Sequence, residues 1–151
     1  MNSIFNSADC REVTARLGHL TPDAQRQWGR MSCHGAVCHL SDAFRASLGD
    51  LPSRRIGTVL YRTVIRFAAL SLPITWPHGA KTLPEFDQEQ GGTPPGDFAK
   101  DMGALEALVV RFVSSKGERL APHPAFGHLT PGEWGRWGYR HLDHHLRQFG
   151  A

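Results

Sequence analysis

Nine histidines occur in 151 residues, and three of them fall within the five residues from His141 to His145. His141 and His145 are four residues apart, so on an α-helix they share one face, about 6 Å apart along the axis. Two imidazoles at this spacing can bind one metal ion. Such a pair is also compatible with ordinary hydrogen bonding, so a third ligand is needed before a metal site is predicted.

His39 is the best third candidate, because helical angles place it at the margin of an apolar face that includes Leu40 and Phe44. His34 falls on the polar side of the same helix, and we expect it to face water. An alternative metal-binding pair is His34 with Cys38, which are also four residues apart, but on the polar side. Cys38 points about 100° away from His39, so we do not expect it to join the histidines.

Three further polar residues could support such a site from outside. Gln148 could orient a ligand or a bound water, with a packed amide as an equal alternative. His144 points toward the arginines of the polar face and is a neighbouring group. Asp42, one turn after His39, could be a hydrogen-bond partner or a base, although a solvated acid is the favoured interpretation.

These residues must be positioned by helices, because the pattern of apolar residues, helix-start residues, glycines and prolines predicts an all-α chain. Helix-start residues, glycines and prolines predict helical segments over residues 8–17, 22–48, 55–72, 98–115 and 131–149. The second could break near Gly29, and the β-branched residues of 55–72 leave a strand as an alternative. Four main helices with short to medium connections predict a bundle, organised as one domain over residues 1–151.

Particular residues define the expected ends of these helices. Ser7 and Asp97 are candidate N-caps, and Thr130 with Glu133 forms a capping-box sequence. Thr21 and Thr130 stand in two copies of Gly-His-Leu-Thr-Pro, and we interpret both copies as helix starts rather than as a remnant of duplication. Trp134 and Trp137, on the last helix, are interpreted as core residues.

Residues 73–96 hold five of the ten prolines and show no helical or strand period. We predict a long ordered loop, rich in proline and glycine. Loops of this length are often lids or binding loops. A proline-stiffened wrap over the bundle, or a subunit contact, is an equal alternative.

Composition excludes several classes of protein. The net charge of +3 is too small and too scattered to indicate nucleic-acid binding. Three cysteines do not form a disulfide framework and fit a reduced, cytoplasmic protein. The most apolar segment, 56–76, contains Arg62 and Arg66, which argues against a membrane span. The chain also lacks a His-Glu-x-x-His or Glu-x-x-His sequence, which argues against a zincin or a ferritin-like di-iron site.

Cys38-His39-Leu40-Ser41-Asp42-Ala43 together with His141-x-x-x-His145-x-x-Gln148 resembles the DinB-like (YfiT-like) metalloenzyme superfamily. Over nearly the whole chain, the sequence resembles an uncharacterised bacterial branch of this superfamily. The resemblance is most specific in the C-terminal block, residues 134–150. It implies a four-helix bundle with a long crossover connection, and a metal triad that maps onto His39, His141 and His145.

The resemblance also implies a class of chemistry. Three imidazoles would leave coordination positions open for a ligand and suit a divalent transition metal, zinc or nickel first and iron as a further option. Some families on this fold are thiol-dependent transferases or isomerases, which implies a small-molecule substrate and a low-molecular-weight thiol. Dimers are common on this fold, so a homodimer is compatible with it. The alternatives are a non-catalytic metal-binding or stress-response protein, and an interaction module.

Overall fold

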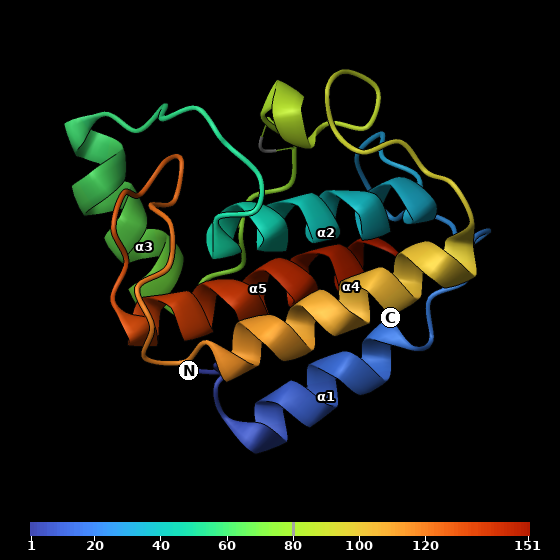
Figure 1. Ribbon diagram of the computed structural model, residues 1–151, viewed down its shortest axis with the longest axis horizontal. Coiled ribbons are helices and arrows are strands. Elements are labelled where there is room, and N and C mark those ends of the chain that lie inside the picture. The colour runs from blue at the N-terminus through green and yellow to red at the C-terminus, as the bar shows by residue number, and fades with distance from the viewer. Residues whose placement is uncertain (80) are drawn as a thin grey trace.

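The computed structural model describes residues 1–79 and 81–151, and this part of the chain is all-helical, with no β-strand among the described residues (Figure 1). It contains five α-helices, one π-helical segment and one short 3₁₀ helix. Their bounds are α1 Ser7–Leu17, α2 Cys33–Leu48, π-helix Tyr61–Ile65, α3 Arg66–Ser71, 3₁₀ helix Pro84–Phe86, α4 Phe98–Ser114 and α5 Pro131–Gln148.

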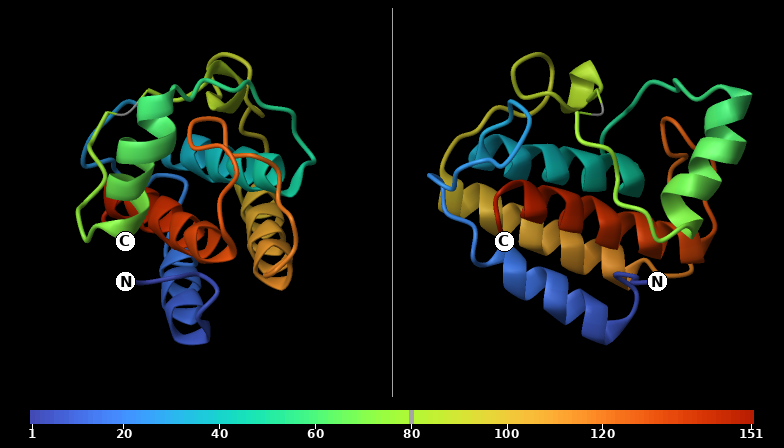
Figure 2. Two further views of the ribbon diagram at one scale, coloured as in Figure 1. Left: turned by 90° about the vertical axis from the view of Figure 1, so that its left-hand side faces the viewer. Right: turned by 180° about the vertical axis from the view of Figure 1, so that it is seen from behind.

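Four long helices lie side by side around the core, and α3 lies across one end of them, against the beginning of α5 (Figures 1 and 2). Helix α2 packs against α4 and α5, and α1 packs against α5. Phe44 and Phe112 meet edge to face at 5.0 Å between ring centroids, and both are fully buried. Trp134 and Trp137 are buried beside them, as predicted. Burial of these apolar faces is the main source of stability for such helices.

Several helix ends lie where the sequence predicts them. The side chain of Asp97 accepts a hydrogen bond from the N–H of Lys100 and caps α4. Thr130 and Glu133 form the predicted capping box of α5. Helix α2 ends at Gly49 in the left-handed conformation, also as predicted. The cap of α1 is Asn6 rather than Ser7, a shift of one residue.

The prediction of a helix from residue 22 to residue 48 is wrong for residues 22–32. Helix α2 begins only at Cys33, where the side chain of Ser32 caps it. Residues 21–32 are irregular, and two of their backbone groups bond to the end of α5: the N–H of Gln27 donates to the carbonyl of Gln148 at 2.7 Å, and the carbonyl of Trp28 accepts from the Gln148 side chain. The first Gly-His-Leu-Thr-Pro copy is therefore a turn, and only the second copy starts a helix.

The segment predicted as a helix over 55–72 is helical from Val59 to Ser71. The helix begins later than predicted because the N–H groups of Ile56 and Gly57 both donate to the carbonyl of Pro124. A Cβ on Gly57 would lie 1.8 Å from the carbonyl oxygen of Ala125, so only glycine fits this approach. No helix in the described part of the chain is long and apolar enough to cross a membrane.

The predicted loop 73–96 is irregular apart from the 3₁₀ helix, and Ala80 within it lies outside the described residues. It passes over the outer side of α2 (Figure 1). Phe86 and Asp87 are buried, whereas most of the remaining loop residues are exposed or half-buried. The loop thus contributes an ordered inner part, which lies against α2 beside His39.

Candidate metal centre

Three histidines from two helices meet in the interior. His39 comes from α2, and His141 and His145 come from successive turns of α5. One ring nitrogen of each lies within 4.8 Å of the others, and the Nε2 atoms of His39 and His141 are 3.1 Å apart. The structure thus brings together the residues of the expected triad, which could hold a metal ion.

The ring of His39 is oriented by a backbone carbonyl. Its Nδ1 lies 2.9 Å from the carbonyl oxygen of Phe86. A carbonyl only accepts hydrogen bonds, so Nδ1 carries the proton and the lone pair is on Nε2. This is the tautomer in which Nε2 can bind a metal, and such outer hydrogen bonds are typical of histidine ligands.

His145 is oriented in the same way by Gln148, one turn further along α5. The Nδ1 of His145 lies 2.8 Å from Oε1 of Gln148, whose amide nitrogen donates to the carbonyl of Trp28 at 3.0 Å. That second bond fixes which end of the amide faces the ring. The lone pair of His145 is therefore also on Nε2, and Gln148 occupies the supporting position considered for it in the sequence.

The segment before α2 is shaped by this contact. Gly29 has a φ of 74°, and a Cβ there would lie 2.9 Å from the amide nitrogen of Gln148. Glycine at this position lets the chain turn and keeps Gln148 in place. The irregular course of residues 21–32 thus helps to orient His145.

His141 differs from the other two ligands in having no outer partner. Its Nδ1 is buried and makes no hydrogen bond to the described residues. The ring is flanked by Trp137 and Trp76, at 5.1 and 5.9 Å between centroids. Because Nε2 of His39 presents a lone pair, Nε2 of His141 can donate to it without a metal. An ion bound by all three Nε2 atoms would replace that hydrogen bond.

Burial keeps the three imidazoles neutral, which is the form that binds metals. Loss of solvent lowers the pKa of His39, although the Phe86 carbonyl partly opposes this. The pKa values of His141 and His145 are lowered well below the ordinary value, first by burial and then by the neighbouring His39. The donor set and its protonation state therefore fit a borderline divalent ion.

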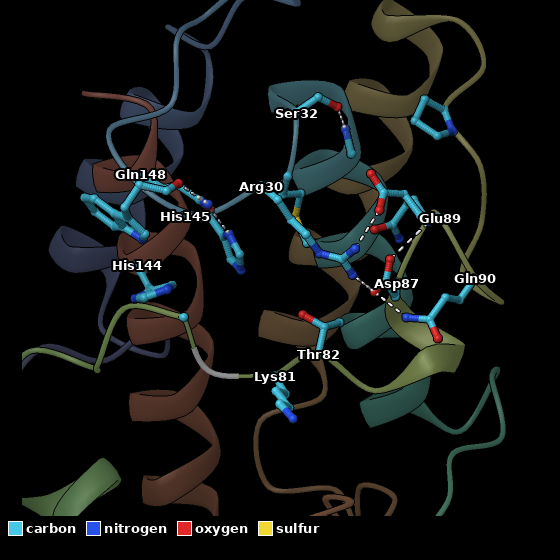
Figure 3. Close-up of a pocket in the computed structure, with 17 residues that line it drawn as sticks. Arg30, Ser32, Lys81, Thr82, Asp87, Glu89, Gln90, His144, His145 and Gln148 are labelled. Carbon is cyan, nitrogen blue, oxygen red and sulfur yellow. Dashed lines mark hydrogen bonds and ion pairs between the residues drawn. The ribbon is translucent and has the colours of Figure 1, made fainter.

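A cavity of about 700 Å³ lies beside the triad, and His145 is the member of the triad that lines it (Figure 3). His144, His145 and Gln148 line one side of it, and Arg30 and Asp87 line the other. Arg30 is paired with Asp87 and with Glu89. A cavity of this size is typical of sites for small molecules.

Residues of the long loop contribute to the surroundings of the triad. Trp76 lies against His141, and its indole nitrogen donates to the carbonyl of Ala69 at 2.9 Å. His78 stacks on Trp28 with 3.8 Å between ring centroids. The loop therefore packs beside the triad, and its role as a lid or binding loop stays a prediction.

The other two supporting candidates lie in different places. His144 lines the cavity and meets the ring of His145 edge to face at 5.2 Å. Asp42 is fully buried rather than solvated, and its carboxylate accepts hydrogen bonds from the N–H and hydroxyl groups of Thr93 at 2.8 and 2.7 Å. Asp42 fastens the loop to α2 and does not bond to a triad imidazole.

The alternative pair, His34 and Cys38, forms a second cluster with Asp101 of α4. His34 is half-buried rather than open to water, with its Nε2 2.7 Å from Oδ2 of Asp101. The same oxygen accepts from the Gly96 N–H at 2.9 Å and from the thiol of Cys38 at 3.8 Å. Burial and then Asp101 raise the pKa of Cys38 to about 12, so this thiol is protonated and unreactive.

Sequence reasoning missed two parts of the site. Phe86 acts through its carbonyl and Trp28 acts through both its carbonyl and its ring. Every residue type has a backbone carbonyl, so no signal in the sequence could have identified the role of Phe86. The role of Trp28 was hidden by the prediction that residues 22–48 are helical.

Comparisons with known proteins give one match. No curated protein and no solved structure matches the chain. The family model described as "Protein of unknown function (DUF1569)" matches residues 5–151. Because this match spans nearly the whole sequence, the chain belongs to the DUF1569 family.

Proposed function

We propose that this protein is a metal-dependent enzyme in which His39, His141 and His145 hold one divalent transition-metal ion beside the cavity. The observation that carries the proposal is the orientation of the rings. Phe86 and Gln148 occupy the Nδ1 positions of His39 and His145, so that the Nε2 lone pairs are left for a ligand. Hydrogen bonding alone would not require two such matched outer partners.

The proposed fold is a four-helix bundle of the DinB-like type, made of α1, α2, α4 and α5, with the segment between α2 and α4 as the long crossover connection. The contacts of α2 with α4 and α5, and of α1 with α5, support it. In this arrangement the ligands come from the second helix and the last helix. The cavity then opens between α5 and the crossover segment, where a substrate can reach His145.

The proposed reaction class is a thiol-dependent transfer or isomerisation on a small molecule, in the cytoplasm. A bound ion would supply Lewis-acid chemistry, polarising a substrate oxygen or lowering the pKa of a thiol. Zinc and nickel suit neutral imidazoles, and iron is a further option. Gln148 and Phe86 hold the imidazoles of His145 and His39 in place, while Trp76 packs against His141. None of these residues is assigned as an acid or base.

Metal analysis of the purified protein tests the site. We expect about one equivalent of a transition metal per chain in the wild type, and less than a tenth of that in His141→Ala and His145→Ala. His34→Ala is the matched control, because it removes a histidine of the second cluster and should keep the metal. Metal-free wild type that does not take up added zinc or nickel would contradict the proposal.

A purely structural metal is the competing function, since the His39 and His145 side chains are more than nine-tenths buried. Substitution of the ion by cobalt(II) distinguishes a catalytic metal from a structural one. An accessible ion beside the cavity should change its visible spectrum when a small thiol is added, whereas a closed structural site should not. A thiol-insensitive spectrum with a strongly raised melting temperature would favour the structural role.

A further inference from the structure

A patch of exposed apolar side chains lies on and around the helix from Val59 to Ser71. Nine of the eleven large apolar residues that are exposed in the described chain fall between positions 56 and 74. Their exposed fractions run from 37 to 79%. They are Ile56, Val59, Leu60, Tyr61, Val64, Ile65, Phe67, Leu72 and Ile74. We call these nine residues the outer face; the helix that carries most of them is turned toward the viewer in the left panel of Figure 2.

Six of the nine outer-face residues belong to the helix from Val59 to Ser71, which is attached by the buried side chain of Leu70 and by polar groups. Arg66 forms a two-pronged ion pair with Glu133 of α5, at 2.7 and 2.6 Å. Arg136 donates to the carbonyl of Leu70 at 2.6 Å, and Arg140 donates to that of Leu72 at 2.7 Å. A helix on a protein surface normally buries its apolar side and exposes its polar side. Here the polar bonds face inward and the apolar side chains face outward.

The spacing of the outward side chains suits packing against another helix. Leu60, Val64 and Phe67 follow one another at intervals of four and three residues, and they are 55, 59 and 60% exposed. Residues at these intervals form one stripe on a helix. Monomeric proteins seldom leave an apolar patch of this extent in water.

We propose that the outer face is a homodimer interface, covered by the outer face of a second copy of this chain. Its nine residues expose on the order of 800 Å², about what one partner contributes to a standard interface. A twofold dimer needs one patch that fits itself, and a continuous apolar stripe on one short helix meets that need.

An anionic lipid surface is the competing partner, because Arg54, Arg55 and Arg62 lie in the same segment. Two arginines of this region are already neutralised within the chain. Arg66 is paired with Glu133, and Arg54 lies 3.6 Å from Glu85. The remaining positive charge is small for attachment to a membrane surface. A second copy is therefore the favoured occupant, and this inference is independent of the proposed metal chemistry.

The test is the mass of the full-length protein in solution, by light scattering and sedimentation equilibrium at micromolar concentrations. We expect a dimer for the wild type and a dissociation constant at least about 100-fold weaker for the double variant Leu60→Glu/Phe67→Glu. Both side chains are more than half exposed, so the variant should fold. Val110→Glu is the matched control, because Val110 is 66% exposed on α4 and lies outside the outer face.

Cysteine cross-linking gives a second readout. Val64→Cys at the centre of the stripe should form a disulfide-linked dimer on oxidation, whereas Val110→Cys should not. A wild type that is monomeric throughout would overturn the proposal, as would a dimer that survives Leu60→Glu/Phe67→Glu. Monomeric protein that sediments with vesicles containing anionic lipid, and loses this property in the double variant, would also overturn it and assign the outer face to a lipid surface.

Discussion

Two clusters of potential metal ligands lie on different faces of α2, and their hydrogen bonding differs. In the triad of His39, His141 and His145, the outer nitrogens of two rings are held by acceptors, and the inner nitrogens point at one another. In the cluster of His34, Cys38 and Asp101, the carboxylate takes up the available donors. Both clusters have the side chains and the short distances of a metal site.

The difference favours the triad over the second cluster as the candidate metal site. A metal at the triad would replace one hydrogen bond, the one between the Nε2 atoms of His39 and His141. A metal at Asp101 would have to displace three hydrogen bonds and the proton of a thiol whose pKa is raised. Asp101 also lies in the first turn of α4, where the helix dipole favours an anion and opposes a cation. We therefore expect the second cluster to stabilise the fold without a metal.

Removing the metal should give the largest effect. In the presence of a chelator, the free energy of unfolding of the wild type should fall by about 4 kcal/mol, as expected when a ligand at a thousandfold excess over its dissociation constant is lost. His145→Ala should show almost no further loss, because its site is already broken. His34→Ala should lose as much as the wild type. Urea denaturation with and without chelator measures this, and a chelator effect that depends on His34 would reverse the comparison.

Replacing the outer partner of His145 should have an intermediate effect. Gln148→Leu removes the acceptor for Nδ1 of His145, so we expect metal binding to weaken 10- to 100-fold while one ion still binds. Gln90→Leu is a matched control, because Gln90 also lines the cavity but bonds Asp87 instead. Competition with a chromogenic chelator gives the affinities. Equal affinities for the two variants would mean that Gln148 does not orient the ligand.

The smallest effect is expected at the second cluster. Asp101→Asn removes the charge that accepts from Gly96, His34 and Cys38, so the free energy of unfolding should fall by about 1 kcal/mol at pH 7, with metal content unchanged. The bond from the Gly96 N–H, and then that from His34, lower the pKa of Asp101 below its usual 3.8. The carboxylate therefore contributes stability above about pH 4, which is lost as the pH falls through the folded pKa.

Urea denaturation at pH 7 and at pH 3 checks this last prediction. The difference between wild type and Asp101→Asn should be present at pH 7 and should shrink toward zero in acid. A difference that stays constant with pH would assign the effect to packing rather than to charge. A loss of metal from Asp101→Asn would place an ion in the second cluster instead.

Much of the helical pattern and the histidine pairing could be predicted from local sequence. The stripe of α4, the capping box of Thr130 and Glu133, and the spacing of His141 and His145 all depend on residues within a few positions of one another. Helix propensity and capping act over that range. The errors occurred where distant contacts override it: residues 21–32 bond the end of α5, and residues 56 and 57 bond Pro124.

The surroundings of Asp42 and His34 were also beyond local reasoning. Helical angles place both on the polar side of α2, but the loop at Thr93 covers Asp42, and Asp101 of α4 bonds to His34. Which polar residues remain in water depends on what packs over the helix, and a single helix contains no information about this.

The sequence by itself determined that the chain forms long helices and which histidines share a face, because the 3.6-residue period converts spacing directly into direction. The tertiary structure alone decided that the Nδ1 atoms of His39 and His145 meet Phe86 and Gln148, and that Gln148 is held by Trp28. It also decided that nine large apolar residues of positions 56–74 face outward, while Leu70 among them is buried. A hydrogen bond needs two groups within about 3 Å and in line, and for groups far apart in the chain only the folded backbone sets that distance.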